Sequence, residues 1–242
     1  LPSQGLLYPE DSPLRSGTID VKYMTAKEED ILTSTNLIEQ GVVITRLLES
    51  VIANPKVKLN DMLIGDKNAI MVGTRILGYG KDYGITLIDP DTQEKVEHIV
   101  DLTKLKNKPI DEKLFENGNS FTLELPNSKR VVGFKLLTQK DEKEIEEAMK
   151  DYEKVEKLTG VSSNLTTRLK HQIVSIDEST DQKEIDNFVD NEFLALDTRA
   201  FRKHLEKITP DIELKFDYTS QTGNLHKIDV PLGIDFFWPA AE

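Results

Sequence analysis

The chain has 242 residues, of which 38% are hydrophobic and 31% are charged, and its 43 acidic and 31 basic residues give a formal net charge of -12. This length allows one large or two small domains that bury about 70% of the unfolded surface without metal or disulfide staples. The basic residues form no block of five or more, which argues against nucleic acid as a partner.

The chain contains no Cys, which excludes disulfides, thiolate nucleophiles and cysteine-ligated zinc. No apolar stretch approaches the roughly 18 to 20 residues needed to span a bilayer, and the amino end lacks a basic region followed by an apolar run. We therefore expect cytosolic synthesis and function, without a membrane partner.

Residues 1–18 carry three prolines and two glycines around Leu6, Leu7 and Tyr8. Proline removes a backbone donor and restricts the chain, so this composition disfavours a helix and predicts an extended arm that lies on a surface. Residues 19–24 follow as a short predicted strand.

The next residues have helical patterns. Residues 25–28 read as a capping box that begins a helix ending near Thr33. Residues 42–53 place apolar side chains at helical spacing and are followed by a proline. Asp66 is the predicted cap of a further helix that ends at Gly78. The first third of the chain is therefore predicted to be mostly helical.

The middle of the chain changes to the period of β-strands. Two predicted hairpins pair residues 83–88 with 95–102 and residues 121–125 with 131–137. Helical patterns return over residues 138–158, 165–175, 181–195 and 197–208, and a last hairpin pairs residues 212–218 with 225–230. We expect the first and last hairpins to share one small sheet.

These patterns predict an α+β fold with a helical N-terminal third, a small antiparallel β-hairpin sheet and a helical insertion. The expected divisions are an extended arm and short strand over 1–24, an α+β core over 25–137 plus 209–242, and a helical insertion over 138–208.

The chain ends in three consecutive aromatic residues, Phe236, Phe237 and Trp238, and the last of these is its only Trp. Aromatic side chains bury about 150 to 250 Å² each, so such an end predicts docking rather than a loose tail. Together with Leu6, Leu7 and Tyr8 of the amino arm, these residues are the predicted partner-docking residues. Whether Trp238 packs on its own sheet or on a neighbouring chain stays open.

Few residues have the arrangement of a catalytic or ligand site. The glycines at 78, 80 and 84 follow a predicted helix instead of leading from a strand into one, which does not fit a phosphate loop. Residues 89–91 begin like a calcium loop, but Gln93 and Glu94 occupy positions that should hold a ligand and a glycine. An Asp-Pro turn explains them better.

The remaining candidates are equally weak. The four histidines match no zinc signature, and no Gly-x-Ser-x-Gly elbow is present. The carboxylates of 141–157 and 177–192 are typical of solvated helix faces, although a hydrolase that uses them is a further alternative. We predict no catalytic, cofactor-binding or metal-binding residues, and hence no enzyme.

Four collinear segments carry a family resemblance: residues 1–9, 24–34 and 63–70, and the end Phe236-Phe237-Trp238-Pro239. Together they resemble the baseplate hub subunit family of T-even-type (T4-like) contractile-tailed bacteriophages. The resemblance spans most of the chain, and residues 24–34 are its most specific part. It implies a non-enzymatic protein of the virion tail baseplate, assembled in the host cytoplasm with other baseplate and tail proteins in a multi-subunit complex.

The chain departs from this family at one place. Many members carry Cys-Pro-x-Cys in the first hairpin and Cys-x-x-Cys-Gly in the last, which is a zinc-ribbon arrangement. The matching residues here are 89–92 and 219–223, and they provide no thiolate. Asp89 with His98 or His226 would make a poor zinc site. We predict a degenerate zinc-ribbon-like pair of turns that still face each other through hydrogen bonds and packing.

Two functions follow from the resemblance. The first is a structural subunit of the baseplate hub that docks onto neighbours through its termini. The alternative is an assembly chaperone that is absent from the mature tail, in which the acidic insertion covers a basic surface of a partner.

Overall fold

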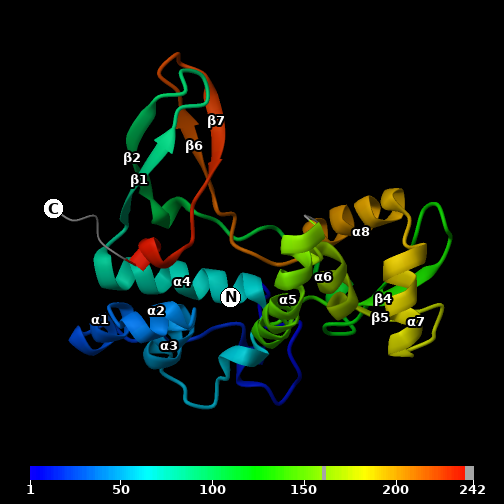
Figure 1. Ribbon diagram of the computed structural model, residues 1–242. Coiled ribbons are helices and arrows are strands. Elements are labelled where there is room, and N and C mark those ends of the chain that lie inside the picture. Colours follow the sequence, from blue (N-terminus) through cyan, green and yellow to red (C-terminus); the bar gives the residue numbers. More distant parts are fainter. Residues whose placement is uncertain (160–161, 238–242) are drawn as a thin grey trace.

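A computed structural model describes the backbone of residues 1–159 and 162–237. Two groups of elements lie side by side in it (Figure 1). One group contains helices α1 to α4 and two β-hairpins, and the other contains helices α5 to α8 and a three-stranded sheet. The predicted α+β class is confirmed.

The first third of the chain is helical, as predicted. It forms α1 (Ala26–Leu32), α2 (Thr35–Glu39), α3 (Val43–Val51) and α4 (Ile64–Tyr79). The capping box is present, because the Glu28 carboxylate accepts hydrogen bonds from the Thr25 amide at 2.9 Å and from its hydroxyl at 2.6 Å. The short helix α2 was not predicted.

The amino-terminal segment differs from the predicted extended arm. It folds into successive turns and a 3-10 helix over Pro13–Ser16. Gln4 and Gly5 have φ values of 51° and 79°, which reverse the chain direction. Residues 19–24 are not a strand, since their pairing is limited to one bridge between Val21 and Ile52. Local sequence favoured extension, but burial of apolar residues in the turns outweighs it.

Asp66 is not the helix cap that the sequence predicted. The N-cap of α4 is Leu63, and Asp66 lies in the first helical turn, fully buried. Its carboxylate accepts hydrogen bonds from the Ser3 hydroxyl and the Tyr8 hydroxyl, both at 2.6 Å. Tyr8 in turn accepts a bond from the Leu63 amide at 2.9 Å. This carboxylate therefore fixes the amino-terminal segment on α4.

The two outer hairpins have the predicted strands but not the predicted shared sheet. The first pairs β1 (Asp82–Ile88) with β2 (Lys95–Asp101), and the last pairs β6 (Lys215–Thr219) with β7 (Leu225–Asp229). Each is a separate two-stranded sheet. They stand together above α4 in Figure 1. Side-chain packing and hydrogen bonds to side-chain carboxylates, instead of strand pairing, join the two.

The segment expected as a helical insertion also contributes a strand. β5 (Ile173–Ile176) pairs with β4 (Val131–Phe134), which pairs with β3 (Phe121–Glu124). The predicted helix over 165–175 thus ends early, because Ile173 and Ile176 are buried on one face of the sheet. Whether 1–24, 25–137 plus 209–242, and 138–208 are separate units stays a prediction.

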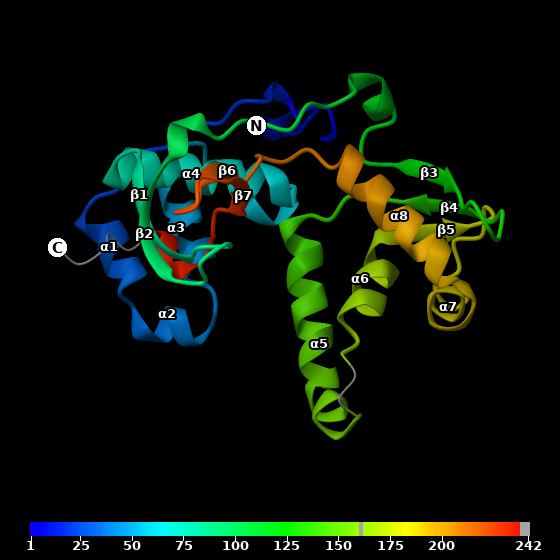
Figure 2. The same ribbon diagram turned by 90° about the horizontal axis from the view of Figure 1, so that it is seen from above.

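The helices of the second group are α5 (Gln139–Thr159), α6 (Asn164–Gln172), α7 (Gln182–Asn187) and α8 (Ala195–Ile208). The predicted helix over 181–195 is replaced by α7 and a π-helical turn over Phe188–Glu192. Figure 2 shows α5 projecting away from the body of the molecule beside α6.

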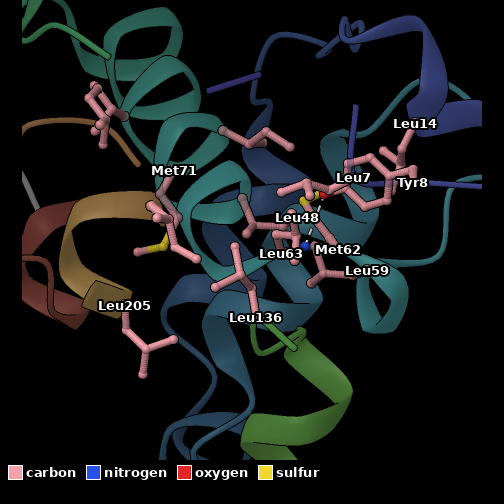
Figure 3. Packing of buried hydrophobic residues seen from close by; sticks show 14 of the residues in the cluster. Leu7, Tyr8, Leu14, Leu48, Leu59, Met62, Leu63, Met71, Leu136 and Leu205 are labelled. Atoms are coloured by element: carbon pink, nitrogen blue, oxygen red, sulfur yellow. Dashed lines mark hydrogen bonds between the residues drawn. The ribbon is translucent and has the colours of Figure 1, made fainter. Parts of the chain in front are cut away.

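The chain crosses twice between the two groups, and the crossings pair with each other. Lys108 donates from its amide to the Asp211 carbonyl at 2.8 Å, and Glu213 donates to the Lys106 carbonyl at 2.7 Å. A close-up of the core shows Leu63, Met71, Leu136 and Leu205 from both groups packed near one another (Figure 3). One hydrophobic core therefore extends through both groups.

Candidate functional site

The turns of the first and last hairpins meet at two carboxylates, Asp89 and Asp91. Asp89 first shapes its own turn, because one carboxylate oxygen accepts hydrogen bonds from the amides of Asp91 at 2.9 Å and Thr92 at 3.0 Å. This is the bonding pattern of an Asx-turn. The Asp89 side chain is fully buried, so its second oxygen needs partners within the protein.

That second oxygen reaches the last hairpin. It accepts from the Tyr218 hydroxyl at 2.8 Å and from the Gln221 amide at 2.9 Å. Because Tyr218 is on β6 and Gln221 is in the following turn, one carboxylate fixes both the strand and the turn. Asp89 thus connects residues about 130 positions apart in sequence.

Asp91 makes a second set of bonds across the same junction. One of its carboxylate oxygens accepts from the Ser220 hydroxyl at 2.5 Å, the Asn224 side-chain amide at 2.9 Å and the Thr222 hydroxyl. Its other oxygen lies 3.1 Å from Nε2 of His226. We call Asp89, Asp91 and their partners in the last hairpin the carboxylate junction.

The electrostatics of the junction favour charged carboxylates. Burial alone would raise the pKa of Asp89, but the amides of Thr92 and Gln221 outweigh it and hold that pKa well below its usual range. Hydrogen bonds from Ser220 and Thr222 lower the pKa of Asp91 in the same way. Both groups are therefore ionised at neutral pH, and their bonds to neutral donors are charge-assisted.

Aromatic rings pack between the two hairpins beneath the junction. The His98 ring on β2 stacks on Phe216 with a centroid distance of 5.1 Å and meets the edge of Tyr218 at 5.3 Å. His98 is therefore a packed strand residue. It does not contact the carboxylates through any hydrogen bond among the described residues.

The prediction that the two turns face each other through hydrogen bonds is confirmed. The residues do not fit a zinc ion. The carboxylates contact hydroxyl and amide donors directly, with Ser220 at 2.5 Å from Asp91, and zinc prefers thiolate and imidazole ligands. Among the side chains that the structure describes, which leave out residues 151–161, 234 and 238–242, no group of three or more His, Cys, Asp or Glu is placed to hold a metal ion. The arrangement is a static cross-link.

The predicted docking residues are mostly buried in their own chain. Leu7 and Tyr8 are 4% and 5% exposed, whereas Leu6 is half-buried at the edge of the core. Phe236 and Phe237 are both fully buried. Trp238 lies outside the described residues. These contacts hold residues 7–8 and 236–237 in the core, and the docking role of the six residues stays a prediction.

The carboxyl-terminal aromatics are fixed by Arg75, a residue that the sequence patterns did not single out. Its Nε donates to the Phe236 carbonyl at 2.9 Å, and its guanidinium lies over the rings of Tyr79 and Tyr83. The Tyr83 ring meets the edge of Phe236 at a centroid distance of 4.9 Å. The sequence offered one indication that Arg75 binds the carboxyl-terminal residues, which is that a single Arg interrupts the apolar pattern of this helix.

The other sequence candidates are dispersed. Gly78 and Gly80 lie at the end of α4, where Gly80 is the C-cap. His171 bonds to the Thr167 carbonyl within its own helix, and burial lowers the pKa of His204. In the acidic segments, described carboxylates have separate structural partners: Asp141 accepts from Thr138, Asp177 pairs with Arg130, and Asp190 pairs with Lys170. None of these places an acid and a base together.

A family model described as T4 bacteriophage base plate protein matches residues 8–238, which is nearly the whole chain. Comparison with curated proteins and with solved structures finds no match. Among the described residues, no helix has the length and apolar character required to cross a bilayer. A base plate protein is a structural part of the virion tail and contacts other tail proteins. The chain therefore belongs to the T4 bacteriophage base plate protein family.

Proposed function

We propose that the chain is a non-enzymatic structural subunit of the baseplate hub of a contractile-tailed phage, assembled in the host cytoplasm and retained in the virion. The observation that supports this most is the carboxylate junction. Both carboxylates are fully bonded: one oxygen of Asp89 shapes its own turn, and the other oxygen of Asp89 and both oxygens of Asp91 bond to the last hairpin. The part of the junction formed by Asp89 and Tyr218 is buried, and buried polar networks whose members are all bonded make a local structure rigid and unique. Such rigidity suits a structural subunit that bears mechanical load better than it suits an enzyme.

The proposal includes the degenerate zinc-ribbon-like character of the paired turns. In that interpretation, two carboxylates take the place of the metal in joining two turns. It also includes docking through the chain ends. Since Phe236 and Phe237 fill the core, the docking contribution of the carboxyl end falls on residues 238–242, and that of the amino end falls on Leu6.

The departing chaperone is the second candidate, supported by the net charge of -12 and by the projection of α5 from the body (Figure 2). An acidic projection attracts a basic partner surface and accelerates encounter.

Quantitative mass spectrometry of purified mature tails, and of hub intermediates from the same infected cells, tests the proposal. We expect this chain at a fixed integer ratio to other hub proteins in both samples. Its presence in intermediates with loss from mature tails would support the chaperone instead. Its absence from both would reject a role in the hub.

A further inference from the structure

A groove of about 720 Å³ lies between β2 and β6. It begins where the two chain crossings pair, at the bridge between Asn107 and Ile212. Beyond this paired base β2 and β6 belong to two separate sheets, which meet again at the stacked rings of His98 and Phe216 and at the carboxylate junction. We call the groove between these two strands, each of which has a pairing partner on one side only, the fork.

The backbone groups that face the fork can be assigned from the strand register. Residues of an antiparallel pair alternate between those bonded to the partner strand and those whose backbone groups point away. At the two ends of the first hairpin, Leu102 bonds to Lys81 and Asp89 bonds to Glu94. The intervening pairing therefore leaves the N–H and C=O groups of Glu97, Ile99 and Asp101 on the free edge of β2.

The same reasoning applies to β6. Ser220 bonds to Asn224 and Val230 bonds to Leu214, which leaves the backbone groups of Lys215, Asp217 and Thr219 on the free edge. Ile99 and Asp101 from β2 and Lys215 and Asp217 from β6 all line the groove. Both strands thus carry unpaired backbone donors and acceptors beside the groove, and an added strand requires such a free edge.

The side chains of the groove indicate what kind of strand fits. Its lining includes Ile99, an apolar side chain that is 67% exposed, and the half-buried ring of Phe216. Its lining also includes four lysines, at 104, 106, 215 and 227, against three acidic residues, in a chain whose net charge is -12. Asp101 is already bonded to Lys81 and Thr103, and Lys215 pairs with Asp229. Three lysines then remain against the carboxylates of Glu213 and Asp217. The groove is thus a locally basic site on an acidic protein.

We propose that this fork binds an extended segment of a neighbouring tail protein, with alternating apolar and acidic side chains, as an added β-strand. The backbone of the segment bonds to the free edges of β2 and β6, its apolar side chains contact Ile99 and Phe216, and its carboxylates lie near Lys104 and Lys106. This inference rests on the proposed function and deepens it, because it names the surface and the chemistry of the partner.

The test uses proline at a free edge, where it removes an outward N–H without breaking the existing ladder. Ile99→Pro does this on β2, and Asp217→Pro does it on β6. Thr86→Pro is the matched control, because Thr86 lies in the same hairpin with its backbone groups on the opposite edge. Lys104→Glu combined with Lys106→Glu tests the charge requirement without changing the backbone.

Each full-length variant is supplied to a phage that lacks the wild-type gene, and mass spectrometry measures the chain in purified tails and hub intermediates. We expect Ile99→Pro, Asp217→Pro and the double lysine variant each to reduce incorporation by at least about tenfold, the effect of losing roughly 1.4 kcal/mol of contact. Thr86→Pro should incorporate at the wild-type level. Circular dichroism establishes whether each variant is folded. If a proline variant is unfolded, the double lysine variant decides the result.

The outcomes separate the two proposals. If the wild-type chain is absent from tails and intermediates, the proposed function fails and this inference fails with it. If the wild-type chain is incorporated and the three groove variants match it, only the groove proposal is overturned. If sedimentation shows that the wild-type chain is a dimer and Ile99→Pro is a monomer, the occupant is a second copy and the proposed partner is wrong.

Discussion

The carboxylate of Asp91 lies 2.5 Å from the hydroxyl of Ser220, although 129 positions separate the two residues in the sequence. Together with the bond between Asp89 and Tyr218, this contact joins two hairpins that share no sheet. Replacing one carboxylate should therefore loosen the hairpins relative to each other without unfolding the helices.

Asp89→Ala is the direct test of the junction. It removes the acceptor of the Gln221 amide, so exchange of that amide with solvent should accelerate by about tenfold or more, as expected when local opening becomes easier. Hydrogen exchange followed by nuclear magnetic resonance measures the change. Asp217→Ala, an exposed carboxylate on β6, is the control and should leave the rate unchanged. Equal rates in both variants would mean that the junction does not restrain the turn.

Tyr8→Phe tests how the amino-terminal segment is fixed. The change removes one bond to the buried Asp66 carboxylate and leaves the Leu63 amide without its acceptor. Loss of a buried partner costs about 1 to 3 kcal/mol in the free energy of unfolding, which urea denaturation measures. Tyr23→Phe is the matched control, since Tyr23 is 72% exposed, and a change beyond about 0.5 kcal/mol there would be unexpected.

Two changes at the carboxyl end distinguish its contribution to stability from its contribution to docking. Phe237→Ala should lower the free energy of unfolding by about 3 to 5 kcal/mol, because it empties a fully buried site. Deletion of residues 238–242 leaves Phe236 and Phe237 in place and should preserve the thermal midpoint while reducing incorporation into tails. Normal incorporation of this truncated chain would reject docking through Trp238.

Acid should destabilise the fold within a defined range of pH. Hydrogen bonds from Ser50 and Thr25 lower the pKa of Glu28 from 4.5 to about 2, and the pKa values of Asp89 and Asp91 are lowered as well. A carboxylate with a lowered folded-state pKa stabilises the protein above its unfolded-state pKa, and this stabilisation is lost as the pH falls toward the folded-state value.

The free energy of unfolding should therefore be nearly constant from pH 7 to about 5 and should fall between about pH 4.5 and 2. Urea titrations at a series of pH values measure it. Glu28→Gln should reduce the slope in this range, because one of the groups with a shifted pKa is then absent. A free energy that stays level down to pH 2 would contradict the hydrogen-bond assignments.

Elements with strong local patterns were predictable from the sequence. Alternation of apolar residues placed β1 and β2 within one residue of their observed bounds, and the capping box placed the start of α1 at Ala26. Prediction failed where distant residues decide the local structure. β5 forms because β4 offers an edge to Ile173 and Ile176, and residues 1–18 form turns because Asp66 supplies buried acceptors for Ser3 and Tyr8.

The candidate site shows the same division. The meeting of residues 89–92 with residues 219–223 was predicted through the family resemblance, since both segments occupy the positions of metal-binding turns. The roles of Tyr218 and Asn224 were missed, because neither residue type marks a site until the two turns are close in space. Free strand edges such as those of β2 and β6 were also not predictable, since the sequence favoured one shared sheet.

Helix α4 contacts both ends of the described chain. Asp66 in its first turn binds Ser3 and Tyr8, and Arg75 near its last turn binds the carbonyl of Phe236. During synthesis, the amino-terminal contacts form early, whereas the contact with Phe236 forms only after residue 236 has left the ribosome. A chain released early therefore exposes the apolar surface of α4 that Phe236 and Phe237 cover, and proteases and chaperones act on such surfaces. The contacts of α4 are thus complete only once residue 236 has been synthesised.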